Sequence, residues 1–175
     1  VYGAEVTLDD VLEFCDSSEN EELSTVCGVL ARWDRRVDVD SQGAQVFTEL
    51  WKGFGSRLGG GFQGVIANDT FWRVDYDSSD PLNTPAGIDL DVVSNQTLLA
   101  EVLLKAEADL TAKGVALDAP WSEVQYLERN NDNVPIHGGS GTIGVYGAIS
   151  ARLSEGGYVN PGSGNSYIQA VTWDE

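Results

Sequence analysis

The sequence predicts an α+β fold in which a helical region, residues 1–119, precedes a β-rich segment, residues 120–175. Two observations predict this order. Apolar residues recur at intervals of three and four in most of the chain up to residue 113, which is the spacing of one helix face. Beyond Pro120, short β-prone runs alternate with Asn, Asp and Gly clusters, as in strands joined by turns. With 175 residues and 42% hydrophobic content, the chain is long enough to form one compact core.

Two short amphipathic helices are expected first, at residues 7–15 and 23–30. The apolar stripe of the first helix consists of Leu8, Val11, Leu12 and Cys15. Thr7 directly precedes this stripe and is placed to cap the first turn of the helix. The same spacing returns in Leu23, Val26, Cys27 and Leu30. Because only a short polar stretch separates the two stripes, they predict a helical hairpin.

Cys15 and Cys27 are the only cysteines, and one lies on each helix of this hairpin. A zinc site is not expected, because no histidine or second cysteine pair lies near them. A disulfide and a pair of free buried thiols both fit the sequence. The disulfide is favoured because each cysteine falls on an apolar stripe and the linker can fold back. It would stabilise the fold by about 3 kcal/mol and would imply an oxidising compartment, the periplasm or the cell exterior.

Two longer helices complete the helical region. The apolar positions of the third helix form an aromatic-rich face of Phe47, Leu50, Trp51, Phe54 and Leu58. The glycine run at residues 59–61 is expected to end it. The fourth and longest helix is expected within residues 91–113 and ends at Gly114 in a left-handed conformation.

No element is predicted at residues 62–89, which show no sustained periodicity. Asp75, Asp77 and Asp80 in this segment have the acidic spacing of a calcium loop. The loop glycine and the closing glutamate of an EF-hand are missing from their places, so a calcium site is not expected.

Short strands are predicted in the last third of the chain, at residues 124–127, 134–137 and 167–173. Between the last two runs, residues 139–144 match the G-x-G-x-x-G pattern of dinucleotide-binding loops. Pro135 fits poorly in a central parallel strand, and no crossover helix leading to a strand with an acidic end follows. A glycine-rich turn is therefore the favoured interpretation of this motif.

His137 is the only histidine, so a histidine base encoded by this chain would have to be this residue. A nucleophile elbow at Ser140 fails because Thr142 occupies the position of the last glycine. His137 is instead expected as a turn residue bonded to the backbone.

The carboxylates of Glu123, Glu128 and Asp132 could supply an acid and a base, but acidic residues are so abundant that such pairs arise by chance. We assign no catalytic residue, metal ligand or cofactor to the chain.

The charge balance excludes some classes of partner. The chain carries 28 acidic and 10 basic residues, for a net charge of −18. This charge repels phosphate backbones and anionic membrane surfaces, so we expect no nucleic-acid and no membrane partner. No apolar run approaches the roughly 18 residues of a membrane span. The first residues lack the layout of a signal peptide and the chain has no methionine, so we expect a processed segment of a longer protein.

Three stretches of the sequence carry a resemblance to a known family. The first comprises residues 29–34 (VLARWD), 39–44 (VDSQGA) and 47–51. The second runs from residues 134–139 (VPIHGG) into 144–149 (GVYGAI), and the third is residues 164–171 (GNSYIQAV). Their order and approximate spacing resemble the later part of the large (beta) subunit of the penicillin acylase family. The nearest branch is that of the acyl-homoserine-lactone and aculeacin-type lipopeptide acylases. The Cys15 and Cys27 pair also resembles a feature of some members.

The resemblance implies a secreted heterodimer made by self-cleavage of a precursor, with an αββα N-terminal-nucleophile hydrolase core that residues 120–175 join. Such an enzyme cleaves the N-acyl amide of an acyl-homoserine lactone, a lipopeptide or a β-lactam side chain. The α-amine of its terminal serine is the base for its own hydroxyl, and an oxyanion hole stabilises the intermediate.

The family's nucleophile, histidine and oxyanion-hole asparagine all lie upstream of the matched region. None of them therefore corresponds to a residue of this chain, and His137 does not match the family's histidine. The partners implied are the remaining large-subunit sequence, the small subunit and an N-acyl small molecule. The alternatives are a free-standing secreted binding or structural module with a disulfide and, less favoured, a nucleotide-binding protein.

Overall fold

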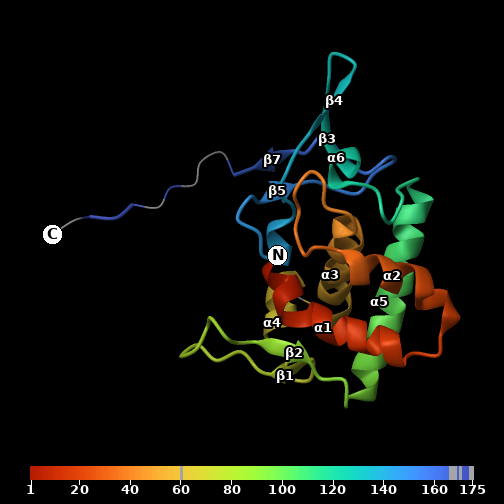
Figure 1. Ribbon diagram of the computed structural model, residues 1–175. Coiled ribbons are helices and arrows are strands. Elements are labelled where there is room, and N and C mark those ends of the chain that lie inside the picture. The colour runs from red at the N-terminus through yellow and green to blue at the C-terminus, as the bar shows by residue number, and fades with distance from the viewer. Residues whose placement is uncertain (60, 166–168, 170, 174–175) are drawn as a thin grey trace.

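The computed structural model describes residues 1–59, 61–165, 169 and 171–173, and its mixture of helices and small sheets confirms the predicted α+β class (Figure 1). The helices are α1 (Tyr2–Ser17), α2 (Ser24–Arg32), α3 (Ala44–Leu58), α4 (Gly61–Ile66), α5 (Val93–Ala112) and α6 (Trp121–Val124), with 3-10 turns η1 (Glu21–Leu23) and η2 (Gly141–Ile143). The strands are β1 (Trp72–Val74), β2 (Ala86–Ile88), β3 (Gln125–Arg129), β4 (Asp132–Pro135), β5 (Ile149–Ser150), β6 (Tyr158–Val159) and β7 (Ser163–Gly164).

The first helix begins more than a turn earlier than predicted, and Thr7 does not cap it. Thr7 is buried inside α1, where its hydroxyl donates a 2.7 Å hydrogen bond to the carbonyl oxygen of Gly3 one turn back. The N-cap prediction is wrong because Ala4, which is fully buried, extends the apolar stripe toward the N-terminus. Packing of this extra turn outweighs the capping preference of Thr7.

Helices α1 and α2 form the predicted hairpin. A disulfide joins Cys15 of α1 to Cys27 of α2, with the two Cα atoms 5.9 Å apart. The connection between the helices contains η1, where the side chain of Asn20 accepts a 3.0 Å hydrogen bond from the amide of Glu22. The disulfide therefore closes a short loop that is also ordered by its own backbone contacts.

Helix α3 is the centre of the core, and α5 packs along it. The close approach of the two helices requires a glycine, because a Cβ atom on Gly53 would lie 2.9 Å from Cγ1 of Val102. Both predicted helix ends are confirmed. Helix α3 stops at Gly59, which has a φ of 81°, and α5 is followed by Gly114 with a φ of 68°.

The segment without periodicity, residues 62–89, contains elements that were not predicted. It holds most of α4 and the antiparallel pair β1–β2, in which Trp72 lies opposite Ile88. Strands of three residues are too short to show alternation, which is why the sequence did not reveal them. The pair is held by polar contacts from helices that are distant in sequence.

Two buried polar side chains attach the β1–β2 pair to the helices. The carboxylate of Asp10 in α1 accepts the amide of Ile88 at 3.1 Å and forms an ion pair with Arg73 at 2.9 Å. The amide of Asn95 in α5 donates to the carbonyl oxygens of Thr70 and Asp89, at 2.8 and 2.9 Å. These bonds position backbone that has little other regular pairing.

The last third of the chain contains a three-stranded sheet of order β4–β3–β6 and a small β5–β7 pair. The predicted strands at 124–127 and 134–137 are confirmed in position as β3 and β4, with shifted ends. Strand β3 starts late because α6 occupies the preceding residues. The turn of the hairpin places Asn130 and Asn131 at positive φ, a conformation that asparagine tolerates. Of the predicted strand at 167–173, residues 167, 168 and 170 lie outside the described part; Gln169 and residues 171–173 are described and are not in a strand.

The helical region and the β-rich segment share one hydrophobic core. The indole of Trp121 in α6 packs 5.4 Å from the ring of Tyr158 in β6 and donates a 2.8 Å hydrogen bond to the carbonyl of Gly138. The side-chain amide of Gln125 donates to the same carbonyl at 3.0 Å. These contacts join α6, β3 and β6 at the loop around Gly138, and the hydrogen bond from Tyr158 to Glu49 attaches β6 to α3.

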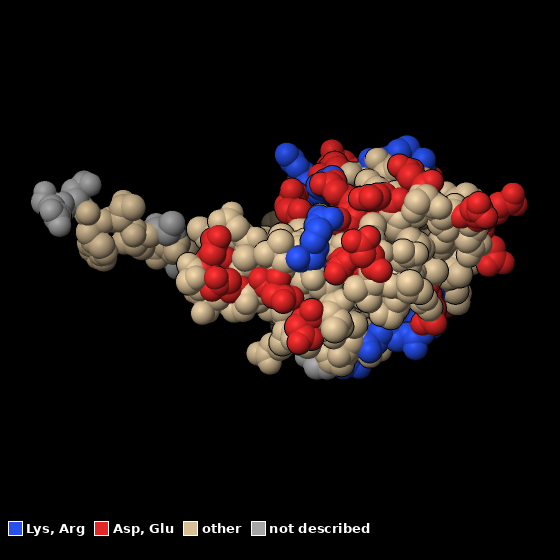
Figure 2. Space-filling model, turned by 90° about the horizontal axis from the view of Figure 1, so that it is seen from below, with Lys and Arg blue, Asp and Glu red and all other residues tan. Residues whose placement is uncertain are grey.

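The surface carries the acidic charge of the sequence in a dispersed form. On the face seen in Figure 2, carboxylates are spread over much of the surface and basic groups lie between them. Within the described part of the chain, no helix is both long and apolar enough to cross a membrane.

Candidate functional site

A pocket of about 430 Å³ lies between α3 and the C-terminal segment. Its α3 side is lined by Thr48, Glu49, Trp51, Lys52, Gly55 and Ser56. Its opposite side is lined by Ser140, Thr142, Ala151, Arg152, Leu153 and Tyr158. Most of the lining surface is apolar, with a few charged and hydroxyl groups, which is the usual composition of a small-molecule site.

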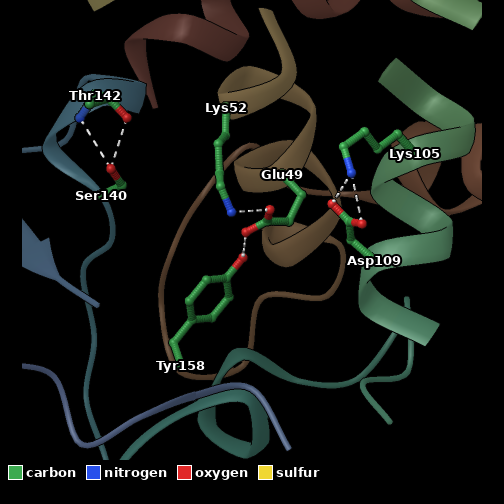
Figure 3. A network of polar contacts seen from close by, with 7 residues as sticks. All are labelled: Glu49, Lys52, Lys105, Asp109, Ser140, Thr142 and Tyr158. Carbon is green, nitrogen blue, oxygen red and sulfur yellow. Dashed lines mark hydrogen bonds and ion pairs between the residues drawn. The ribbon is translucent and has the colours of Figure 1, made fainter. Parts of the chain in front are cut away.

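Glu49 places a buried carboxylate in the wall of this pocket. Its side chain is only 3% exposed, and both of its oxygens have partners (Figure 3). Oε1 accepts a 2.8 Å hydrogen bond from the hydroxyl of Tyr158, and Oε2 accepts one of 2.8 Å from Nζ of Lys52. A buried charge without such partners would be strongly destabilising, so the three residues form one unit.

Tyr158 is the inner partner of this unit. Burial, reinforced by the neighbouring charge of Glu49, raises the pKa of the Tyr158 phenol well above its ordinary range. The phenol is therefore protonated at neutral pH and acts as a hydrogen-bond donor. It cannot serve as a base there.

The hydroxyl groups across the pocket do not form a nucleophile with a base. The hydroxyls of Ser140 and Thr142 lie 2.8 Å apart and bond to each other (Figure 3). No histidine or cysteine lines the pocket in the described part of the chain. The arrangement can bind a ligand through apolar contacts and charge, but it does not activate a hydroxyl for attack.

His137 lies outside this pocket. It is exposed and borders a shallow hollow that is also lined by Asp38 and Tyr146. The predicted bond from its ring to the backbone is absent among the described residues. Residues 139–144 form a turn rather than a strand-to-helix loop, with η2 in the middle and Gly144 at a φ of 76°.

The remaining acidic candidates are dispersed. Glu128 accepts a 2.9 Å hydrogen bond from the side chain of Asn160, and Asp132 lies opposite Arg129 in the β3–β4 hairpin. Glu123 is exposed on α6. None of the three lines the pocket, and they do not form an acid–base pair.

The carboxylates of Asp75, Asp77 and Asp80 also do not converge on one point. The side chain and then the backbone amide of Ser79 donate to the carboxylate of Asp77, and these bonds lower the pKa of Asp77. Asp80 accepts from Asn83 at 2.7 Å. Among the described residues, no group of three or more His, Cys, Asp or Glu side chains is arranged to hold a metal ion.

Sequence reasoning missed Glu49 and Tyr158. The one available signal was the position of Glu49 between the apolar residues of the third predicted helix, where a charged residue is unusual. Nothing in the sequence pairs it with a tyrosine 109 residues later. That pairing depends on the tertiary fold.

Replacing Tyr158 with phenylalanine is expected to lower the free energy of unfolding by about 2 kcal/mol at pH 8, because it removes a buried hydrogen bond to a charged group. The difference should shrink above pH 10. There the unfolded phenol ionises while the buried one does not, so the wild type loses stability that the variant never had. Urea unfolding at pH 8 and pH 11 measures both effects.

Tyr146→Phe is the matched control, because Tyr146 is 86% exposed. It should leave the stability unchanged at both pH values. A Tyr158→Phe variant as stable as this control would show that the bond to Glu49 contributes nothing.

Comparison with known proteins gives a consistent result over the whole chain. The family profile described as penicillin amidase matches residues 1–175. An acyl-homoserine lactone acylase PvdQ of Pseudomonas fluorescens (strain Pf0-1) is 34% identical over 177 residues, which cover all of this chain and 21% of that protein. The PvdQ acylase of Pseudomonas syringae pv. syringae (strain B728a) is 32% identical over 178 residues, covering all of this chain and 22% of the protein.

A relative named for a different activity is also similar. The aculeacin-A acylase of Actinoplanes utahensis is 29% identical over 181 residues, which cover 98% of this chain and 20% of that enzyme. The chain thus spans about a fifth of the length of the curated relatives that it matches.

Proposed function

Since the chain belongs to the penicillin amidase family, we propose that it is part of a secreted acylase that hydrolyses N-acyl amide bonds with an N-terminal serine located outside residues 1–175. The observation that carries this proposal is the similarity of the whole chain to proteins named as acylases. The substrates in their names support an acyl-homoserine lactone or a lipopeptide as the substrate class. A β-lactam side chain is the further candidate suggested by the family's own description.

The separate roles of this chain and of the rest of the enzyme follow from the chemistry of such enzymes. An N-terminal nucleophile needs its own α-amine as base and an oxyanion hole for the tetrahedral intermediate. The pocket of this chain offers a buried carboxylate, a protonated phenol and paired hydroxyls. This chain therefore supplies scaffold and a binding pocket, and the rest of the large subunit and the small subunit supply the catalytic groups.

An oxidising location fits the Cys15–Cys27 disulfide. Disulfides persist in the periplasm and outside the cell and are rare in the cytosol. The disulfide therefore supports a location of the parent acylase in the periplasm or the exterior.

The purified 175-residue chain is expected to show no turnover of an acyl-homoserine lactone or a chromogenic acyl amide, whereas the complete gene product should hydrolyse at least one of them. Release of the amine, measured against a buffer blank, gives the rate. The complete product carrying alanine in place of its terminal serine is the matched control and should be inactive.

Turnover by the 175-residue chain would contradict the claim that catalysis lies elsewhere. An inactive complete product that is correctly folded, with the disulfide formed, would favour the alternative of a secreted binding or structural module.

A further inference from the structure

The pocket described above has an apolar floor and a basic rim. Trp51, Ala151 and Leu153 contribute the apolar surface, and Trp51 is itself 2% exposed. Lys52 and Arg152 are both exposed and both line the pocket. An apolar floor beside cations is complementary to a molecule with an apolar part and an anionic end.

The charges of the pocket do not cancel. Glu49 and Lys52 form an ion pair at 2.8 Å, so together they are neutral. Arg152 forms no ion pair with any carboxylate in the described part of the chain, although the protein as a whole carries a net charge of −18. The lining therefore keeps one uncompensated positive charge, which favours an anion.

A cationic ligand is disfavoured by the same geometry. The carboxylate of Glu49 is 3% exposed, and each of its oxygens already accepts a hydrogen bond. Because so little of it is exposed, this carboxylate offers an incoming amine almost no access. An anion, in contrast, meets the two unused hydrogens of the Lys52 ammonium group and the planar donors of Arg152 without breaking an existing contact.

Hydroxyl groups extend this donor surface. Ser140 and Thr142 bond to each other at 2.8 Å, and because only one of them can donate in that bond, the other hydroxyl hydrogen is available to a ligand. Ser56 lines the same pocket from α3. The donors thus lie on both sides of the cavity.

We propose that this pocket binds an amphiphilic carboxylate, with the apolar tail against Trp51 and Leu153 and the carboxylate between Lys52 and Arg152. A volume of about 430 Å³ is within the range of small-molecule pockets. The proposal rests on the lining residues alone and does not depend on the acylase assignment.

Binding of octanoate to the ¹⁵N-labelled 175-residue chain, followed by NMR, tests the proposal. Octanoate should shift the indole N–H of Trp51 and the amide of Leu153, while the indoles of Trp33 and Trp72, which do not line the pocket, should not move. Octanol, octylamine and acetate separate the contributions of tail and charge. Octanoate should bind about fivefold more tightly than octanol, which is the upper end of what a partly exposed charge contact contributes. Octylamine and acetate should bind more weakly than octanol.

Two variants locate the binding site. Arg152→Gln should weaken octanoate binding about fivefold and leave octanol binding unchanged. Arg129→Gln is the matched control, since Arg129 is an exposed arginine of β3 that does not line the pocket, and it should have no effect. Ser56→Trp places a ring in the cavity and should abolish binding of both ligands.

Other results would overturn the proposal. Equal affinities for octanoate and octanol would show that the rim does not select a carboxylate. Equal effects of Arg152→Gln and Arg129→Gln would place the anion elsewhere, as would octanoate shifts confined to residues that do not line the pocket.

Discussion

Phe54→Ala is expected to lower the free energy of unfolding by about 4 kcal/mol, the largest effect that we predict for a single substitution. Phe54 lies in α3 and is fully buried. Its ring centroid is 6.1 Å from that of Trp51 and 5.1 Å from that of Phe71. The substitution removes apolar area, opens a cavity and breaks two ring contacts, at the point where α3 meets Phe71, the residue before β1.

Urea unfolding monitored by circular dichroism measures this loss. A decrease of about 4 kcal/mol is a large share of the roughly 5–15 kcal/mol that stabilises an ordinary domain. Tyr146→Ala is the matched control, because it removes an aromatic ring that is 86% exposed, and it should change stability by less than about 0.5 kcal/mol. If the two variants were equally stable, Phe54 would not be a core residue.

Loss of the Cys15–Cys27 disulfide is expected to cost about 3 kcal/mol. The two cysteines are 12 residues apart, and the chain-entropy estimate for a loop of this size gives about that value. The double variant Cys15→Ser/Cys27→Ser removes the bond and leaves no free thiol. Its urea midpoint should be lower than that of the wild type, with the loss centred on the α1–α2 hairpin.

Reduction of the wild type provides the control for this comparison. Dithiothreitol should lower the wild-type midpoint toward that of the double variant, and it should leave the double variant unchanged. A wild-type midpoint that is insensitive to full reduction would mean that the disulfide does not stabilise the fold.

The spacing of apolar residues along the sequence correctly predicted the long helices. The stripe through Phe47 and Phe54 predicted α3, and Gly59 and Gly114 marked helix ends that the structure places there. The pattern failed where tertiary packing decided the outcome. Threonine is a residue type that favours the N-cap position, but Thr7 lies inside α1, because Ala4 becomes buried when the helix is extended.

The short strands and the pocket could not be predicted from local sequence patterns, for a different reason. Strands β1 and β2 depend on hydrogen bonds from Asp10 and Asn95, which belong to helices distant in sequence. The pocket depends on Glu49 meeting Tyr158 across the fold. The motifs at His137 and at residues 139–144 form no catalytic arrangement in the described part of the chain. A motif specifies residue types, but it does not specify which side chains lie beside them in the fold.

The bond between Glu49 and Tyr158 also bears on the order in which the molecule assembles. It closes a span of 109 residues, and strand β6 pairs in parallel with β3 rather than with a strand next to it in the chain. Contacts of such large sequence separation cannot form until the intervening chain has been restricted, because closing a long loop has an entropic cost that no local bond repays. Helices α1 to α5 are built from local contacts, so we expect them to form before β6 docks. We therefore expect the pocket wall to be completed late in folding, when β6 docks against β3 and α3.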